Sequence, residues 1–284
     1  MPPMVLEQII PFERLEKNPW LILFISFIFV SFAVLLTRYF YPNDRGVVVI
    51  LLTIMPAIPF FLNFIRVEEK KHELSSSKKH SLFTIYRPLI MLYAFFFIGT
   101  ALSFALWSSA LPADLSDYMF SDIKDEFNRL QNAYVPAMHQ PTSAFDFILN
   151  KNLLVLALMI LFSFIYSIGA IFLLTWNAAM LGVFIEVHVR AYFISLSQQF
   201  GLFAYPIAFV MGSVEGLLSI LPHGIFELSA FFLAALGGGI LSVAFERGTY
   251  RHRAFWCIVL DSMKLFLLAV VLLVAGALIE SLYA

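Results

Sequence analysis

Residues 221–227 read Leu-Pro-His-Gly-Ile-Phe-Glu, and they interrupt one of the most apolar regions of the chain. Proline is favoured in the first turn of a helix, where its missing N–H has no intrahelical partner to lose, so Pro222 predicts the start of a helix. His223 and Glu227 are four residues apart and would share one face of that helix. The same face continues through small residues that let another helix come close, namely Ala230, Ala234 and Gly238.

The polar pair has two interpretations. An ionisable residue at membrane depth is a candidate functional residue, because its burial in hydrocarbon is costly. Alternatively, His223 and Glu227 lie at the level of the lipid headgroups, where they only cap and anchor the helix.

The composition around this stretch indicates the fold class. Of the 284 residues, 61% are hydrophobic and 13% are charged, whereas a soluble domain has about 25% charged residues. Repeated apolar runs near bilayer length predict an all-α, polytopic helical bundle in a membrane. The net charge of -1 says nothing about nucleic acid, but the chain has no basic domain, so no nucleic-acid partner is expected. The single Cys257 excludes a disulfide framework.

The apolar runs predict seven crossings within one transmembrane domain. Their approximate ranges are 20–40, 47–65, 88–111, 152–175, 200–221, 222–246 and 254–280. Residues 176–190 hold an apolar run of only about eight residues, too short to cross, which predicts a broken or re-entrant segment. Pro56 and Pro59 predict a kink or a break in the second span.

Charge divides the chain into three parts and predicts its orientation. Residues 1–111 form a three-span part, 112–150 an acidic segment, and 151–284 the remaining core. The basic loops 66–87 and 247–253 are expected on the cytoplasmic side. The protein is thus expected in the plasma membrane, with its N-terminus inside and its C-terminus outside. The outer segment is expected to include an amphipathic helix, because its apolar residues recur near helical spacing: Tyr118, Met119, Ile123, Phe127 and Leu130.

Two motifs stand in a fixed order about 45 residues apart. The first is Phe-Leu-Leu-Thr-Trp-Asn-Ala-Ala-Met-Leu-Gly at 172–182, and the second is Leu-Pro-His-Gly-Ile-Phe-Glu-Leu-Ser-Ala at 221–230, followed by three glycines at 237–239. Together they resemble the stage II sporulation protein M family, and the leading spans resemble its longer, archaeal-type members. The resemblance implies a role in membrane remodelling, since the family acts in engulfment with two cell-wall-degrading partners. It also maps the family's polar residues onto Asn177, His223 and Glu227.

These three residues are the predicted polar intramembrane cluster. We expect Asn177 to approach the His223–Glu227 pair and to hold two broken segments together. Further candidates are Trp176, Glu186, His188, Glu215 and Asp261. Asp261 and Lys264, three residues apart, are expected to neutralise each other. His223 and Glu227 have the spacing of a zinc pair, but zinc catalysis needs at least three ligands. No catalytic residue, metal or cofactor is therefore predicted.

Three classes of function remain open. The favoured one is a non-catalytic scaffold or assembly factor for envelope or membrane remodelling, with membrane lipids and envelope proteins as partners. The alternative is a transporter for a small molecule, ion or lipid, since paired broken helices mark transporter sites. An intramembrane hydrolase is the third. The small-residue stripe predicts either a homodimer or close packing within one chain.

Overall fold

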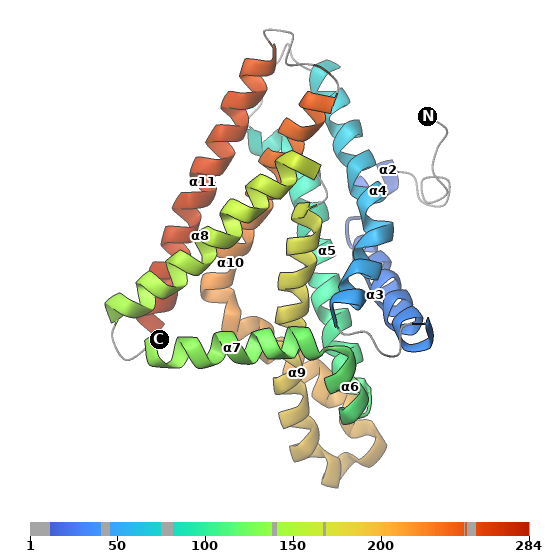
Figure 1. The fold of residues 1–284 in the computed structure, drawn as a ribbon. Helices are drawn as coiled ribbons and strands as arrows, with labels where there is room; N and C mark the ends of the chain where they lie inside the picture. The colour runs from blue at the N-terminus through green and yellow to red at the C-terminus, as the bar shows by residue number, and fades with distance from the viewer. Residues whose placement is uncertain are drawn as a thin grey trace.

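The computed structural model describes residues 12–40, 46–74, 82–137, 141–166, 169–246, 248 and 254–283. Regular secondary structure in these ranges is helical, and they contain no strand (Figure 1). The prediction of an all-α membrane bundle is confirmed.

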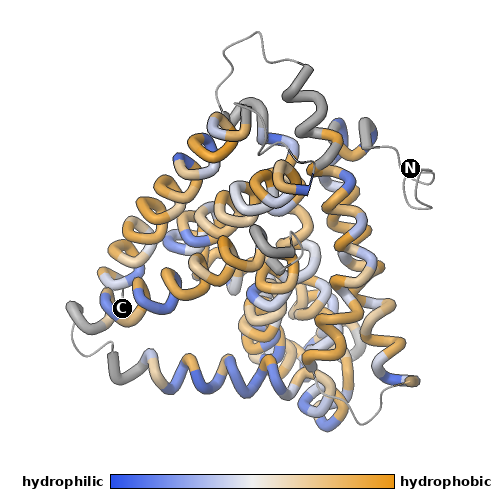
Figure 2. The backbone as a smooth tube through the Cα atoms, turned by 45° about the horizontal axis from the view of Figure 1, so that its top comes forward, coloured by the Kyte–Doolittle hydropathy of each residue, from blue (hydrophilic) through white to orange (hydrophobic). Residues whose placement is uncertain are grey.

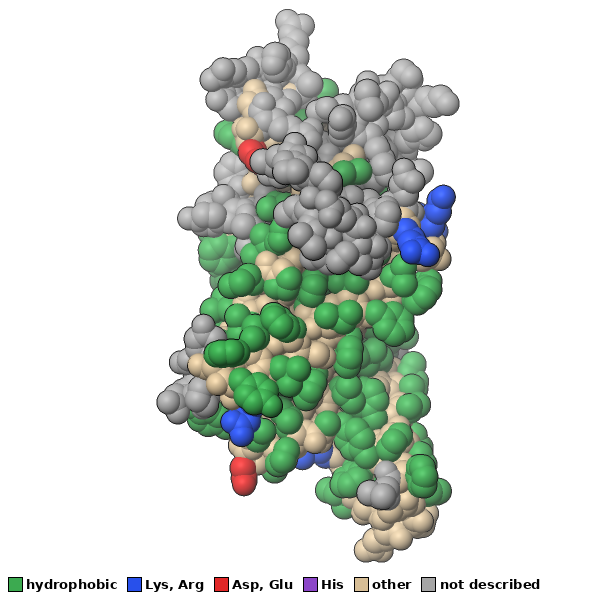
Figure 3. Space-filling model, turned by 90° about the vertical axis from the view of Figure 1, so that its right-hand side faces the viewer, with side chains coloured by type: hydrophobic (Ala, Val, Ile, Leu, Met, Phe, Trp, Pro, Cys, Tyr) green, Lys and Arg blue, Asp and Glu red, His purple; other side chains and the backbone are tan. Residues whose placement is uncertain are grey.

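Seven of the helices are long and apolar enough to cross a membrane, as the sequence predicts. They are α3 (Leu21–Phe40), α4 (Gly46–Leu74), α5 (Leu82–Ala110), α8 (Pro141–Tyr166), α9 (Gly169–Phe200), α10 (Ala204–Glu246) and α11 (Ala254–Tyr283). The shorter elements are α2 (Phe12–Lys17), α6 (Ala113–Met119), α7 (Ser121–Ala137) and the 3-10 turn Gly201–Phe203. Hydrophobic side chains cover the middle of the face drawn in Figure 3, and charged ones lie toward its ends.

The predicted broken segment at 176–190 is wrong, because α9 runs without interruption from Gly169 to Phe200. The Asn177 amide donates to the Leu173 carbonyl one turn earlier, at 2.7 Å, so its polarity is satisfied within the helix. Gly182 serves packing instead. A Cβ at Gly182 would lie 2.6 Å from Cβ of Phe104, so α9 and α5 approach closely there.

The boundaries of three other predicted spans also change. Ranges 200–221 and 222–246 belong to one helix, α10, with Pro222 in its interior. An internal proline removes one backbone donor, a loss that a long membrane helix can tolerate. The predicted span 152–175 is divided between α8 and α9. Helix α4 continues through Pro56 and Pro59, so the second span is not broken.

The core of the bundle is built from aromatic rings and small residues. The Phe61 ring stacks on Tyr93 at 4.9 Å and meets Phe96 edge-on at 5.0 Å, which joins α4 to α5. In α10, Ala230 and Ala234 are fully buried, and a Cβ at Gly238 would clash with Ser163 of α8. The small-residue stripe therefore packs within the chain, the second of the two alternatives that the sequence left open.

Helix α7 lies across one end of the bundle, roughly perpendicular to the long helices (Figure 1). It is the predicted amphipathic helix: Figure 2 shows it as the most hydrophilic long segment, while Ile123 is buried against the bundle. The turn between α9 and α10 extends past α7. The ends of α4, α5, α10 and α11 that flank the two basic loops lie at the opposite end (Figure 1).

Candidate functional site

A cavity of about 670 Å³ lies between α7, α8, α9, α10 and α11. Its walls are mostly apolar and aromatic, with Phe127 from α7, Phe147 from α8 and Phe184 from α9. Polar side chains converge on it from four of the five helices: Gln131, Tyr134, Lys151, Asn152, Ser219, His223, Glu227 and Glu280. An apolar cavity with a few convergent polar groups is the usual form of a small-molecule site.

A pair of carboxyl groups from two helices marks the polar part of the cavity. Glu227 of α10 accepts a hydrogen bond from Nδ2 of Asn152, at 2.5 Å. Glu280 of α11 accepts one from the Tyr134 hydroxyl, at 2.9 Å. The Glu227 and Glu280 side chains also lie close enough to interact electrostatically. Burial raises the pKa of Tyr134, and its Glu280 partner raises it further, which keeps Tyr134 a hydrogen-bond donor.

A glycine on α11 explains how the two carboxyl groups meet. A Cβ added at Gly276 would lie 3.1 Å from Cγ of Glu227 and 3.3 Å from Cβ of Phe226. The absence of a side chain at Gly276 lets α11 approach α10 at this level. Glu280 lies one turn further along the same face of α11, so the close approach places it beside Glu227.

The predicted cluster is brought together only in part. His223 and Glu227 line the same cavity, as their four-residue spacing predicts. Asn177 lines an adjoining cavity of about 230 Å³ together with Asn152 and Glu227. Among the described residues, the amide that bonds Glu227 is Asn152, whereas the Asn177 amide bonds within its own helix. Trp176 packs on Phe172 one turn before it, with ring centroids 6.1 Å apart.

Glu186 forms a different, structural centre. Its side chain is 5% exposed and lies 3.0 Å from Nζ of Lys124 and 2.7 Å from Nε of Arg190. Arg190 also donates to the Ser108 carbonyl at the end of α5, at 2.9 Å. The Lys124 ammonium in turn binds Asp117 at 2.8 Å and lowers the pKa of that carboxyl group. This network attaches α6 and α7 to α5 and α9.

The remaining candidates lie away from the cavity. Nδ1 of His188 is 3.1 Å from the Phe184 carbonyl. Glu215 of α10 lies near the Tyr192 hydroxyl of α9. Asp261 binds Lys264 at 2.7 Å on an exposed part of α11, so the predicted mutual neutralisation is confirmed.

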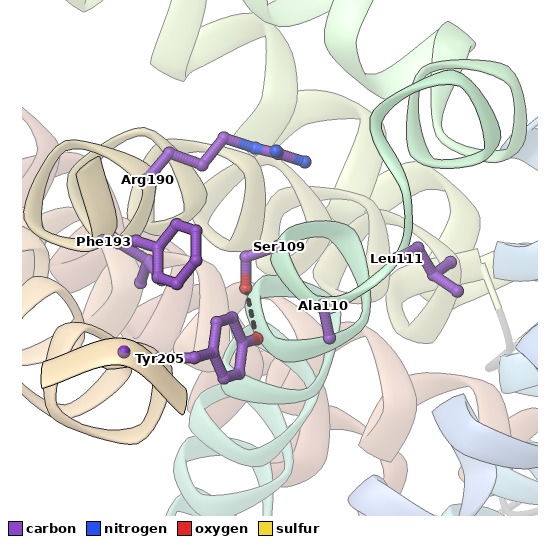
Figure 4. A pocket seen from close by; sticks show the side chains of 8 residues that line it. Ser109, Ala110, Leu111, Arg190, Phe193 and Tyr205 are labelled. Atoms are coloured by element: carbon purple, nitrogen blue, oxygen red, sulfur yellow. Dashed lines mark hydrogen bonds between the residues drawn. The ribbon is translucent and has the colours of Figure 1, made fainter. Parts of the chain in front are cut away.

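A second cavity of about 410 Å³ lies beside the Glu186 network (Figure 4). The Ser109 and Tyr205 hydroxyl groups in its wall bond each other at 2.9 Å. Arg190 also lines this cavity, but Glu186 neutralises its charge. The described ranges contain no group of three His, Cys, Asp or Glu side chains that could hold a metal ion.

Sequence reasoning missed three residues of the polar group, namely Tyr134, Asn152 and Glu280. One signal could have found them. Asn152 begins the predicted fourth span and Glu280 ends the seventh, and both ends face the outer side in the predicted topology. The predicted sixth span starts on that side with His223 and Glu227, so that topology places all four residues at one level of the membrane.

Comparison with known proteins identifies the family of the chain. The family of stage II sporulation protein M matches residues 92–284, which is more than half of the chain and includes every residue of the cavity. No curated protein and no solved structure matches the chain significantly. The chain is therefore a multi-pass membrane protein that belongs to the stage II sporulation protein M family.

Proposed function

We propose that the protein binds and handles an amphipathic small molecule or lipid in the cavity between α7 and α11. The observation that carries the proposal is the convergence of five helices on one mostly apolar space with a carboxyl pair in its wall. An open, mostly apolar cavity with a few convergent polar groups is the usual form of a small-molecule site, and a scaffold that acts through its surface does not require one.

The wall of the cavity supports entry of a ligand. Gln131, Lys151, Ser219 and Pro222 line the cavity and are exposed, so they mark its opening. Ile148 is 4% exposed and marks a closed part. The outer face of α8 carries exposed apolar side chains such as Leu154 and Leu161, which suit contact with lipid chains. The cavity is thus bounded by a helix that itself faces lipid.

Filling the cavity is expected to expel the ligand. In Ser219→Trp the indole would occupy the opening, and native mass spectrometry in mild detergent is expected to show loss of a small molecule or lipid that the wild type retains. Leu218→Trp is the matched control. Leu218 is the neighbouring residue on α10, is 59% exposed and does not line the cavity. Equal retention of small molecules by both variants would contradict the proposal.

A scaffold function is the second candidate, and the α9–α10 turn favours it. Three apolar side chains near the turn are more than 60% exposed: Ile194, Phe203 and Val210. This turn projects past the hydrophilic α7 (Figure 1), and exposed apolar patches in water mark interaction sites. The same mass spectra distinguish the two functions, because a scaffold would retain a protein partner in both tryptophan variants and no specific small molecule.

We also propose that the end of the bundle bearing the two basic loops faces the cytoplasm of a cell whose plasma membrane holds the protein. The support is their lysine and arginine content against the acidic segment 112–150. After removal of the exposed Cys257, an impermeant thiol reagent applied to intact cells is expected to label a cysteine at Asn128 of α7. It is expected to leave a cysteine at Ser76 unlabelled. The reverse pattern would invert the orientation.

A further inference from the structure

We propose that the ligand of this cavity carries an ammonium group on an apolar chain, and that Glu227 and Glu280 bind the ammonium. The inference rests on the proposed ligand-binding function and names the chemical class of the ligand. It is carried by three properties of the cavity: its carboxyl pair, its aromatic walls and the position of its one lysine.

No cation of the described residues is paired with the carboxyl groups, although His223 and Lys151 line the same cavity. The groups that bond Glu227 and Glu280 are the neutral amide of Asn152 and the neutral hydroxyl of Tyr134. Among the described residues, no Lys, Arg or His forms an ion pair with either carboxyl group. Two adjacent carboxyl groups disfavour each other's ionised form. An ammonium group donates up to three hydrogen bonds and carries a positive charge that offsets this repulsion.

The aromatic walls add a second preference for a cation. Four aromatic side chains, Phe127, Tyr134, Phe147 and Phe184, line the same space. Ring faces attract ammonium groups, and aromatic cages are a known means of binding them. The cavity itself contains an example, because Nζ of Lys151 lies over the Phe147 ring, 5.9 Å from its centroid.

The ammonium group of Lys151 does not occupy the position beside the carboxyl pair that we assign to the ligand. Its side chain is exposed at the opening of the cavity, and it forms no ion pair with Glu227 or Glu280 among the described residues. The inner part of the cavity therefore combines carboxyl groups, ring faces and apolar walls. Its volume, about 670 Å³, falls within the range of roughly 300–1,000 Å³ found for sites of drug-sized ligands. A cavity of this size can hold a charged head group together with an apolar chain.

Three probes with the same chain test the inference on the full-length protein in non-ionic detergent, each below its own micelle concentration or solubility limit. Dodecylammonium is expected to bind at least tenfold more tightly than dodecanol, and dodecyl sulfate more weakly than dodecanol. Butylamine, which carries an ammonium on a short chain, is expected to compete poorly. Equal competition by butylamine would overturn the requirement for the chain and assign the site to a soluble amine.

Two variants test whether the carboxyl pair causes the preference for the cationic probe. Glu227→Gln/Glu280→Gln is expected to lose the preference for the cation while retaining dodecanol binding, which also shows that the cavity is intact. Asp261→Asn is the matched control, since it removes an exposed acid on α11 outside the cavity. Equal binding of all three dodecyl probes to the wild type would overturn the ammonium inference and leave the proposed function standing. If none of them binds, the proposed function fails as well.

Discussion

Gly212→Ala is expected to lower the thermal stability of the protein by several degrees, although it adds a single methyl group. Gly212 lies where α10 crosses α9, and a Cβ there would lie 2.5 Å from the backbone nitrogen of Val189 and 2.6 Å from its Cα. Because these are backbone atoms, no side chain can turn aside, and the two helices must separate. Overpacking of this kind costs about 1–3 kcal/mol and occasionally more.

Gly239→Ala provides the matched control for this crossing. Gly239 is a buried glycine of the same helix, and a Cβ there would meet only the Cδ1 atom of Ile65, at 3.3 Å. Alanine favours a helix over glycine by up to about 1 kcal/mol, so Gly239→Ala is expected to leave the unfolding temperature unchanged or slightly higher. Similar unfolding temperatures for the two variants in scanning fluorimetry would contradict the packing described for α9 and α10.

Glu186→Ala is expected to destabilise the fold by a similar amount, and to loosen α7 in particular. The substitution removes the largely buried carboxylate that Lys124 and Arg190 share. Removal of one partner from a buried ion pair costs about 3–5 kcal/mol, and the cost here is expected at or below the lower end of this range, because Lys124 keeps Asp117 and the Arg190 side chain is 38% exposed. Hydrogen exchange measured by mass spectrometry is expected to rise across α7 before it rises in α10.

An exposed ion pair serves as the reference for this effect. Asp261→Ala breaks the Asp261–Lys264 pair on α11, whose members are 31% and 65% exposed. Surface pairs contribute about 0–1 kcal/mol, so little change is expected. If Glu186→Ala lowers the free energy of unfolding no more than Asp261→Ala does, the Glu186 network does not anchor α7, the helix that forms one wall of the cavity.

Much of the fold could be predicted from the sequence, because membrane crossing depends on local composition. A run of about 20 apolar residues is long enough to span the hydrocarbon core, and this rule finds seven crossings. The boundaries were predicted less well. Asn177 and Pro222 suggested breaks, yet the Asn177 amide is satisfied one turn away and Pro222 removes only one donor. Both residues therefore lie inside uninterrupted helices.

The candidate site shows the same limit. His223 and Glu227 could be paired from their spacing, because both residues lie on one helix. Asn152, Glu280 and Tyr134 come from three other helices, and periodicity carries no information about which helices are neighbours. The close approach at Gly276 decides that Glu280 meets Glu227. A single glycine among many in an apolar sequence does not reveal such a contact.

The most direct test of the cavity is an experimental structure of the wild-type protein in a lipid nanodisc. The account predicts elongated density between α7, α8 and α10, with one end beside Glu227 and Glu280 and the other along the aromatic walls. A structure in which side chains of α7 and α8 fill this space, so that no ligand-sized volume remains, would contradict the account.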